Sequence, residues 1–299
     1  AYEMQRSLVG SGDVYKRQDF NSIYQQKSII TAFKEAGYQT AFFSNQRYNH
    51  SFIDFFGKEA DTCNFIKENV KHANYNPSDD ELLELVATEL AKNAPKQFIV
   101  LHTYGSHFNY RERYPSENAF FLPDFPVDAE VKYKDNLVNA YDNSIRYTDD
   151  FLARLIGMLQ EQNTDAAMLY SSDHGEDIFD DSRRLFLHAS PVPSYYQIHV
   201  PFLLWMSDSY RDHYPSLWEN TISNKQKNIS SSASFFHTML ELGGVTTPYR
   251  NDSLSVVNGL FTEKPRVYLN DHNEARSLNE IGMGEEDFEM LQQKGILYR

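Results

Sequence analysis

The most chemically suggestive stretch of the chain is SSDHGED, residues 171–177, which directly follows the apolar run AAMLY. Asp173 and His174 place a carboxylate oxygen beside an imidazole nitrogen, a ligand pair that Zn²⁺ or Mn²⁺ accepts. Gly175 lets the chain turn at the end of the strand, so that both side chains can converge on one ion. The alternative is a polar turn in which Asp173 caps the next helix.

Other histidines also follow apolar segments. His102 ends FIVLH, His107 follows it across the Gly105 turn, and His188 ends LFLH, while VYLN leads to Asp271 and His272. Each could be an ordinary packed or surface residue. Because sites in open α/β sheets form at the carboxyl ends of the strands, we expect His107, Asp173, His174 and His188 to converge at one edge, with His102 nearby.

The segments that must position these residues alternate between helix-like and strand-like patterns. Residue 78 is a serine followed three residues later by Glu81, which predicts a capping box with Ser78 as N-cap. Repeated alternation of helix and strand favours an α/β fold with a mainly parallel sheet covered on both faces. The pattern predicts helices at 22–37, 78–95, 132–162 and 230–244, and strands at 38–46, 96–107, 165–173, 199–208 and 265–271.

Composition excludes several classes of function. The 299 residues are 41% hydrophobic and carry 28 Lys and Arg against 42 Asp and Glu, a formal charge of −14. A globular protein is expected, without the broad basic face that binds nucleic acid or anionic membranes, so an anionic substrate needs a local cation. Cys63 is the single cysteine, which excludes an intrachain disulfide, and no stretch reaches the roughly 20 apolar residues of a membrane span.

Five motifs in order resemble one known family. VLHTYGSHFNYRERYP, NAYDNSIRYTDDFLARLI, SSDHGED, LHASP and HVPFLLW are similar to segments of bacterial phosphoethanolamine transferases that modify lipopolysaccharide, in the sulfatase-like branch of the alkaline phosphatase superfamily. The resemblance covers roughly residues 19–275. It implies an alkaline-phosphatase/sulfatase-like three-layer α/β sandwich with a mainly parallel central sheet, in a monomer.

The resemblance also implies roles for individual residues. Asp173 and His174 match zinc ligands of the family, in a site with one or two zinc ions. His107 and His188 match catalytic histidines that bind the transferred phosphate or a second zinc, and His102 matches a further substrate-side histidine. The implied reaction moves phosphoethanolamine from phosphatidylethanolamine to lipid A or a core sugar, through a covalent phospho-threonine enzyme, at the periplasmic face of the inner membrane.

The N-terminal segment departs from the family's pattern. The family's threonine nucleophile and an acidic zinc ligand precede the region that begins near Asp19, where residues 1–18 contain no threonine and resemble a translated sequencing adaptor. We therefore expect residues 19–299 to be a catalytic domain truncated at its N-terminus and separated from its transmembrane domain. Such a chain should bind zinc weakly and lack turnover.

Three alternatives remain open at the level of sequence. A sulfatase needs a cysteine or serine in a C/S-x-P-x-R setting, and Cys63 lies in DTCNFI without it. A phosphoglycerol transferase shares the fold and the type of nucleophile. A non-catalytic remnant would retain the histidines without a nucleophile.

Overall fold

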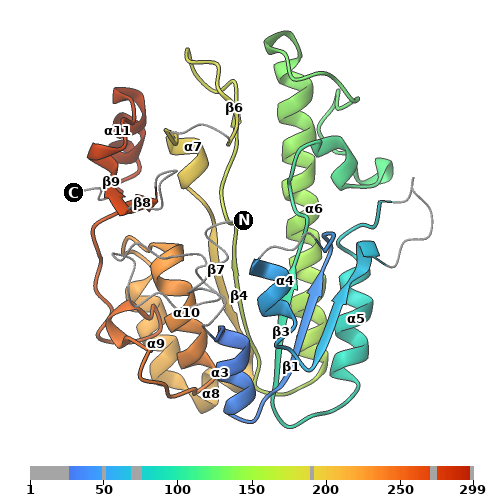
Figure 1. Cartoon of the computed structure of the whole chain (residues 1–299), viewed down its shortest axis with the longest axis vertical. Coiled ribbons are helices and arrows are strands. Elements are labelled where there is room, and N and C mark those ends of the chain that lie inside the picture. Colours follow the sequence, from blue (N-terminus) through green and yellow to red (C-terminus); the bar gives the residue numbers. More distant parts are fainter. Residues whose placement is uncertain (1–26, 49–51, 69–75, 189–191, 270–274, 297–299) are drawn as a thin grey trace. The chain divides into compact units, whose positions relative to one another are not determined.

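The computed structural model describes residues 27–48, 52–68, 76–188, 192–269 and 275–296. The chain divides into two compact units. One, here called the α6 unit, contains residues 34–162 and 178–187. The other, called the α10 unit, contains residues 163–177 and 188–299 together with 1–33. Figure 1 labels the elements of both units.

The α6 unit is built on a parallel sheet of three strands. Strand β1 (Gln39–Ser44) lies between β2 (Thr62–Phe65) and β3 (Gln97–His102), with Phe42 opposite Cys63 on one side and Val100 on the other. Residues 40–44 of β1 are all buried, as is usual for a central parallel strand covered on both faces. The parallel sheet predicted from the alternating pattern is therefore confirmed in this unit.

Helices of the α6 unit form where the sequence has apolar residues at helical spacing. The long helix α6 (Lys134–Glu161) buries Leu137, Ala140, Ser144, Tyr147, Phe151 and Leu155, which recur every three or four residues. Helix α5 (Glu81–Leu90) packs against β1 and β3. It begins at Glu81 with Asp80 at the N-cap, so the predicted N-cap at Ser78 is displaced by two residues. Helix α4 (Phe52–Gly57) also belongs to this unit, whereas most of α3 (Ile29–Glu35), which precedes β1 in the chain, belongs to the α10 unit.

The α10 unit contains a second, antiparallel pairing. Strand β4 (Ala167–Ser171) pairs with β7 (Phe202–Met206), with Leu169 opposite Leu204. Both strands were expected from sequence, but their antiparallel direction was not. A further antiparallel pair joins β8 (Val267–Leu269) to β9 (Ala275–Ser277). The described helices of this unit are α7 (Tyr195–Ile198), α8 (Asp208–His213), α9 (Pro215–Asn224), α10 (Ser231–Leu242) and α11 (Glu285–Gln293).

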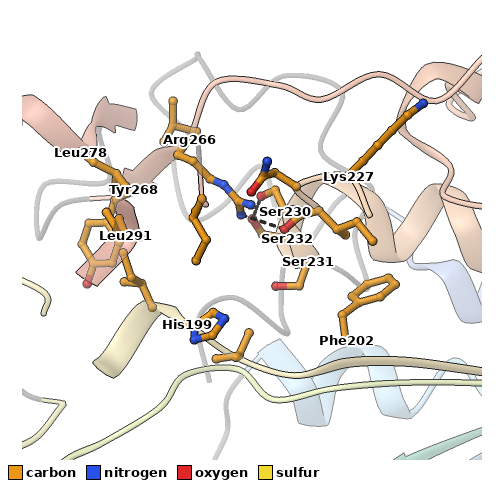
Figure 2. Close-up of a pocket in the computed structure, with 16 residues that line it drawn as sticks. His199, Phe202, Lys227, Ser230, Ser231, Ser232, Arg266, Tyr268, Leu278 and Leu291 are labelled. Atoms are coloured by element: carbon orange, nitrogen blue, oxygen red, sulfur yellow. Dashed lines mark hydrogen bonds between the residues drawn. The ribbon is translucent and has the colours of Figure 1, made fainter. Parts of the chain in front are cut away.

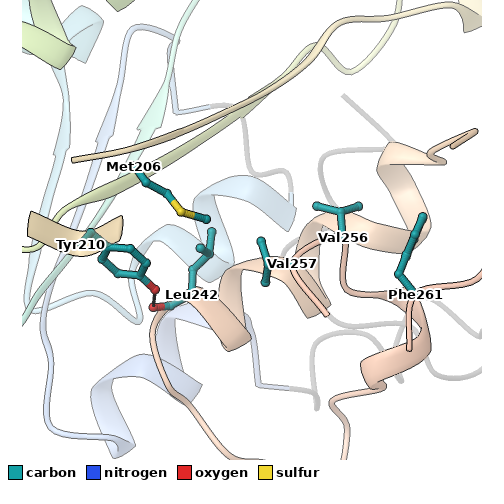
Figure 3. Close-up of a cluster of buried hydrophobic side chains, with 6 residues drawn as sticks. All are labelled: Met206, Tyr210, Leu242, Val256, Val257 and Phe261. Atoms are coloured by element: carbon teal, nitrogen blue, oxygen red, sulfur yellow. Dashed lines mark hydrogen bonds between the residues drawn. The ribbon is translucent and has the colours of Figure 1, made fainter. Parts of the chain in front are cut away.

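An apolar cluster holds β7 against α8 and α10. Figure 3 shows Met206, at the end of β7, close to the Tyr210 and Leu242 side chains. The Tyr210 hydroxyl donates to the Leu242 carbonyl at 2.6 Å, which satisfies both buried polar groups. Because Met206 pairs with Ala167, the cluster fixes the start of β4, and the pairing with β7 continues to Ser171, where SSDHGED begins. The buried members are Met206, Tyr210, Leu242, Val256, Val257 and Phe261.

Two short strands follow the SSDHGED segment. Strand β5 (Asp177–Ile178) pairs with β6 (Phe186–Leu187), and His188 comes directly after β6. The hairpin therefore contains the polar stretch and reverses the chain between His174 and His188, as their spacing predicts. Among the residues that the structure describes, no helix combines the length and the apolar character needed to cross a bilayer.

Candidate metal centre

The SSDHGED segment turns where the backbone of α7 comes unusually close. The Gly175 amide donates to the Gln197 carbonyl at 2.8 Å. A Cβ at position 175 would meet the Tyr196 carbonyl oxygen at 2.1 Å. Glycine is therefore needed here because two backbone segments approach each other closely. This reason differs from the one that the sequence suggests, which is that glycine lets the chain turn.

Asp177 fastens the same segment to the start of α7. Its buried carboxylate accepts hydrogen bonds from the Ser194 hydroxyl at 2.8 Å and from Gln197 Nε2 at 2.5 Å. Ser194 is also the N-cap of α7. These bonds leave Glu176, the residue before Asp177, held in a fixed orientation.

His174, Glu176 and His188 form one compact group of possible metal ligands. One ligand atom from each lies within 4.8 Å of the others. The two imidazole rings stack, with centroids 3.6 Å apart and planes inclined by 30°. His188 Nδ1 donates to Glu176 Oε1 at 3.0 Å. The structure thus brings together His174 and His188, two of the residues that the sequence singles out, and adds Glu176.

The two histidines differ in their electrostatic environment. The hydrogen bond that His188 donates to Glu176 is the main cause that raises the pKa of His188 above its ordinary value. Burial is the main cause that lowers the pKa of His174. The two stacked rings therefore have pKa values shifted in opposite directions.

Glu176 fits a metal ion because half of its carboxylate has no protein partner. Its side chain is only 4% exposed, and Oε2 is buried without any hydrogen-bond donor. A buried carboxylate oxygen without a donor or cation is costly, so this atom is available to a metal ion. The donor set of imidazole nitrogen and carboxylate oxygen is one that zinc prefers.

The orientation of His174 agrees with the same interpretation. Its Nδ1 donates to the Gly175 carbonyl at 2.9 Å, which leaves Nε2 of the neutral ring with a free lone pair. A backbone carbonyl that fixes one ring nitrogen while the other binds metal is the usual arrangement for zinc-binding histidine. Asp173 Oδ2 lies 3.8 Å from that Nε2, so the predicted pair Asp173 and His174 could share an ion on this side of the ring.

The other two predicted histidines belong to the α6 unit. His102 is the last residue of β3, is 5% exposed, and hydrogen-bonds through Nδ1 to the Ser44 hydroxyl at 2.9 Å. His107 is exposed, and its ring centroid lies 5.0 Å from that of Tyr104. Both stand at or beyond the carboxyl end of β3, as predicted. Their convergence with Asp173, His174 and His188 stays a prediction.

Sequence reasoning missed the residue that holds the loop of His107. Asp79 accepts the backbone amides of Tyr104 at 2.8 Å and Gly105 at 2.9 Å, and the Asn45 side-chain amide at 2.8 Å. A carboxylate that accepts several amide bonds fixes a turn strongly. Asp79 directly follows Ser78, in a segment that we interpret as a helix cap. This position is the one sequence feature that could have drawn attention to Asp79.

Some sequence predictions concern other parts of the chain. Asp271 and His272 lie outside the residues that the structure describes, as do residues 1–18 with the expected N-terminal boundary.

Glu176 was missed as a ligand although it belongs to the quoted motif. Its position two residues after His174, in a segment that turns back on itself, is the signal that could have found it.

Comparison with known sequences identifies relatives of one kind. Residues 3–245 match the sulfatase family. Phosphoethanolamine transferase EptC of Escherichia coli strain K12 is 27% identical over 252 residues, 81% of this chain and 42% of that protein. The Kdo(2)-lipid A phosphoethanolamine 7''-transferase of the same strain is 38% identical over 142 residues, 46% of this chain and 24% of that protein. The chain thus spans less than half the length of the curated relatives it matches.

Solved structures share the fold. The C-terminal periplasmic domain of Escherichia coli EptC, solved in complex with zinc, superimposes with a TM-score of 0.80 at 23% identity, over 95% of this chain and 79% of that one. The corresponding domain of EptC from Campylobacter jejuni gives a TM-score of 0.71 at 25% identity, over 89% and 81%. These similarities confirm the alkaline-phosphatase/sulfatase-like α/β fold that the sequence predicts.

Proposed function

Because this chain belongs to the sulfatase family, we propose that it is built for zinc-dependent transfer of phosphoethanolamine from phosphatidylethanolamine to lipid A or a core sugar of lipopolysaccharide. One observation supports this most strongly: a buried, unpartnered Glu176 oxygen in a group with His174 and His188. The names of the relatives supply the transferred group.

In this proposal Asp173, His174 and Glu176 hold the zinc, in a site for one or two ions. When bound, the ion lowers the pKa of a hydroxyl nucleophile and offsets charge on the phosphoryl oxygens. In a protein of charge −14, it is also the local cation that an anionic donor requires.

His188 acts on the phosphoryl group in the same proposal. Glu176 accepts the hydrogen bond of its Nδ1 and raises its pKa, and the ring gives a proton to the oxygen of the departing diacylglycerol. His107 and His102 contribute hydrogen bonds on the substrate side. The bond from phosphorus to the diacylglycerol oxygen breaks as the bond to the threonine nucleophile forms.

We further propose that the chain works as a monomer at the periplasmic face of the inner membrane, attached to a transmembrane domain. The support is its likeness to domains described as C-terminal and periplasmic. A membrane-bound donor and a lipid acceptor require such a location.

The choice of transferred group is tested by binding. Titration calorimetry on the zinc-loaded chain should show O-phosphoethanolamine binding more tightly than glycerol 3-phosphate. His188→Ala should weaken that binding at least tenfold, while His213→Ala, at an exposed histidine, should not. Tighter binding of glycerol 3-phosphate would favour a phosphoglycerol transferase, and hydrolysis of an aryl sulfate would favour a sulfatase.

Turnover is tested with a fluorescent phosphatidylethanolamine. Residues 1–18 contain no threonine, so we propose that they do not supply the nucleophile, and the purified chain should release no diacylglycerol. Sustained release with stoichiometric zinc, abolished by Asp173→Ala, would contradict this and point to Ser7 or Ser11 as the attacking group.

A further inference from the structure

The α10 unit contains a cavity that the proposed reaction does not use. Its volume is about 280 Å³, just below the range of typical small-molecule sites. Its walls come from the end of α7, the first residue of β7, the start of α10 and the β8 region (Figure 2). His174, Glu176 and His188 do not line it.

One wall of the cavity contains a cation, Arg266, which donates from Nη1 to the Ile229 carbonyl at 2.8 Å. Lys227 also lines the cavity, but its Nζ donates to the Phe261 carbonyl at 2.9 Å and extends away from Arg266 (Figure 2). Neither cation has a carboxylate within ion-pair distance among the described residues. Burial lowers the pKa of Arg266. The group still has N–H donors to offer an anion.

Glu263 is the carboxylate whose charge most affects the pKa of Arg266, but it accepts its hydrogen bonds from a different residue. It accepts from the backbone amide of Asn228 at 2.5 Å and from its side-chain amide at 3.1 Å. Its side chain is exposed, so its charge is screened by solvent. The positive character of Arg266 and Lys227 is therefore only partly offset.

The start of α10 faces the same cavity. Ser230 is the N-cap but makes no side-chain capping bond, and the amides of Ser231 and Ser232 have no acceptor among the described residues. The first turn contains no acidic residue. Figure 2 shows these three serines beside the Arg266 guanidinium. Unpaired amides at a helix N-terminus attract anions, here next to the Arg266 guanidinium.

Apolar side chains also line the cavity. Leu278 and Leu291 lie on one side of it, and Phe202 lies on the other side, beside Ser231 (Figure 2). His199 also lines the cavity, hydrogen-bonded through Nδ1 to the Tyr195 hydroxyl at 2.7 Å, and burial is the main cause that lowers its pKa. The cavity therefore combines a cation and free backbone amides with hydrocarbon surface.

We propose that this cavity binds a small anionic amphiphile, a phosphate monoester with a short alkyl or acyl group. Arg266 and the amides of Ser231 and Ser232 hold the anion, and the apolar lining residues contact the alkyl or acyl chain. A soluble phosphate ester and a lipid head group share this chemistry.

The test uses hexyl phosphate as the probe, in titration calorimetry on the full chain with metal removed. Hexyl phosphate should bind, inorganic phosphate more weakly because it lacks the alkyl group, and hexanol not at all. Arg266→Gln should raise the Kd at least tenfold. Lys264→Gln removes the same charge at an exposed position two residues away and should leave the Kd unchanged.

A second variant keeps the proposal testable if Arg266→Gln fails to fold. Ser231→Asp places a carboxylate in the first turn of α10, where it stabilises the helix while repelling an anion. It should keep or raise the melting temperature and abolish hexyl phosphate binding. His174→Ala should leave this binding intact, which separates the inference from the proposed function.

The inference is overturned if Arg266→Gln and Ser231→Asp bind hexyl phosphate as the wild type does, or if His174→Ala alone abolishes binding. Sedimentation with phosphatidylcholine vesicles containing phosphatidic acid then shows whether the ligand is a lipid head group or a soluble phosphate ester. Co-sedimentation lost in Arg266→Gln supports a lipid ligand, and its absence alongside tight hexyl phosphate binding supports a soluble ester.

Discussion

At the scale of single residues, two histidine–carboxylate pairs of the α10 unit show how burial changes chemistry. His188 bonds to Glu176 at 3.0 Å, and His213 bonds to Asp165 at 2.9 Å. The Glu176 side chain is 4% exposed and has a second oxygen without a donor, whereas Asp165 is 33% exposed. The same pair of groups is thus a surface contact in one place and part of a ligand cluster in the other.

Glu176→Gln should reduce zinc affinity by at least tenfold, because the amide oxygen is a weaker ligand and the charge is lost. The pKa of His188 should fall, since the Glu176 bond is the main cause of its increase. Asp165→Asn makes the same chemical change at the exposed pair and should alter neither quantity. Equilibrium dialysis with zinc and NMR titration of the histidine ring protons measure both. Equal zinc affinity in wild type and Glu176→Gln would remove Glu176 from the ligand set.

At the scale of elements, the sequence predicts what apolar patterns determine locally. Strand β1 and the long helix α6 lie in the expected segments because their buried residues form a continuous run or recur with a helical period. Strands β3 and β4 lie in the expected segments because each contains an apolar run of sequence. The antiparallel direction of β7 depends on pairing between distant segments, which a local pattern does not contain. The same is true of Asp79, whose backbone partners Tyr104 and Gly105 lie about 25 residues further along the chain.

The need for glycine at position 175 is set by a neighbouring element, helix α7. Gly175→Ala should destabilise the protein by several kcal/mol or displace α7, because the new Cβ would meet the Tyr196 carbonyl oxygen at 2.1 Å. Gly157→Ala is the matched control: it lies within α6, where a Cβ meets nothing within 4 Å. That change should stabilise the helix by about 0.5–1 kcal/mol.

Thermal unfolding and zinc binding of the two alanine variants give the comparison. Gly175→Ala should lower both the melting temperature and the zinc affinity, since Asp177 and Glu176 follow the displaced turn. A Gly175→Ala protein with wild-type zinc affinity would show that the close contact with α7 does not position the ligands.

At the scale of the whole molecule, charge constrains where anions can bind. With a formal charge of −14, the protein repels anions over most distances, so binding requires local cations. The structure offers two such places in the α10 unit. One is the His174, Glu176 and His188 group, where a metal would supply the charge. The other is the cavity with Arg266, which carries its own.

The stability of the folded chain should also depend on pH through a histidine that belongs to neither place. His237 on α10 is 3% exposed, and its Nδ1 accepts the Asn251 amide at 3.1 Å. Burial is the main cause that lowers its pKa to about 4, with the charge of Arg250 next and Asp252 acting in the opposite direction. The native state therefore holds this ring neutral, whereas the unfolded chain takes up a proton near its ordinary pKa of about 6.5.

Because the unfolded state binds more protons between these two pKa values, stability falls as pH decreases through that window. From pH 7 to pH 4 the His237 contribution amounts to a loss of ~3 kcal/mol. His237→Asn keeps an acceptor for the Asn251 amide but cannot titrate, so its free energy of unfolding should fall by ~3 kcal/mol less over the same range. His213→Asn, at an exposed ring, should follow the wild-type pH dependence. Urea unfolding at both pH values measures the difference, and parallel curves for wild type and His237→Asn would show that the native state accommodates a protonated His237.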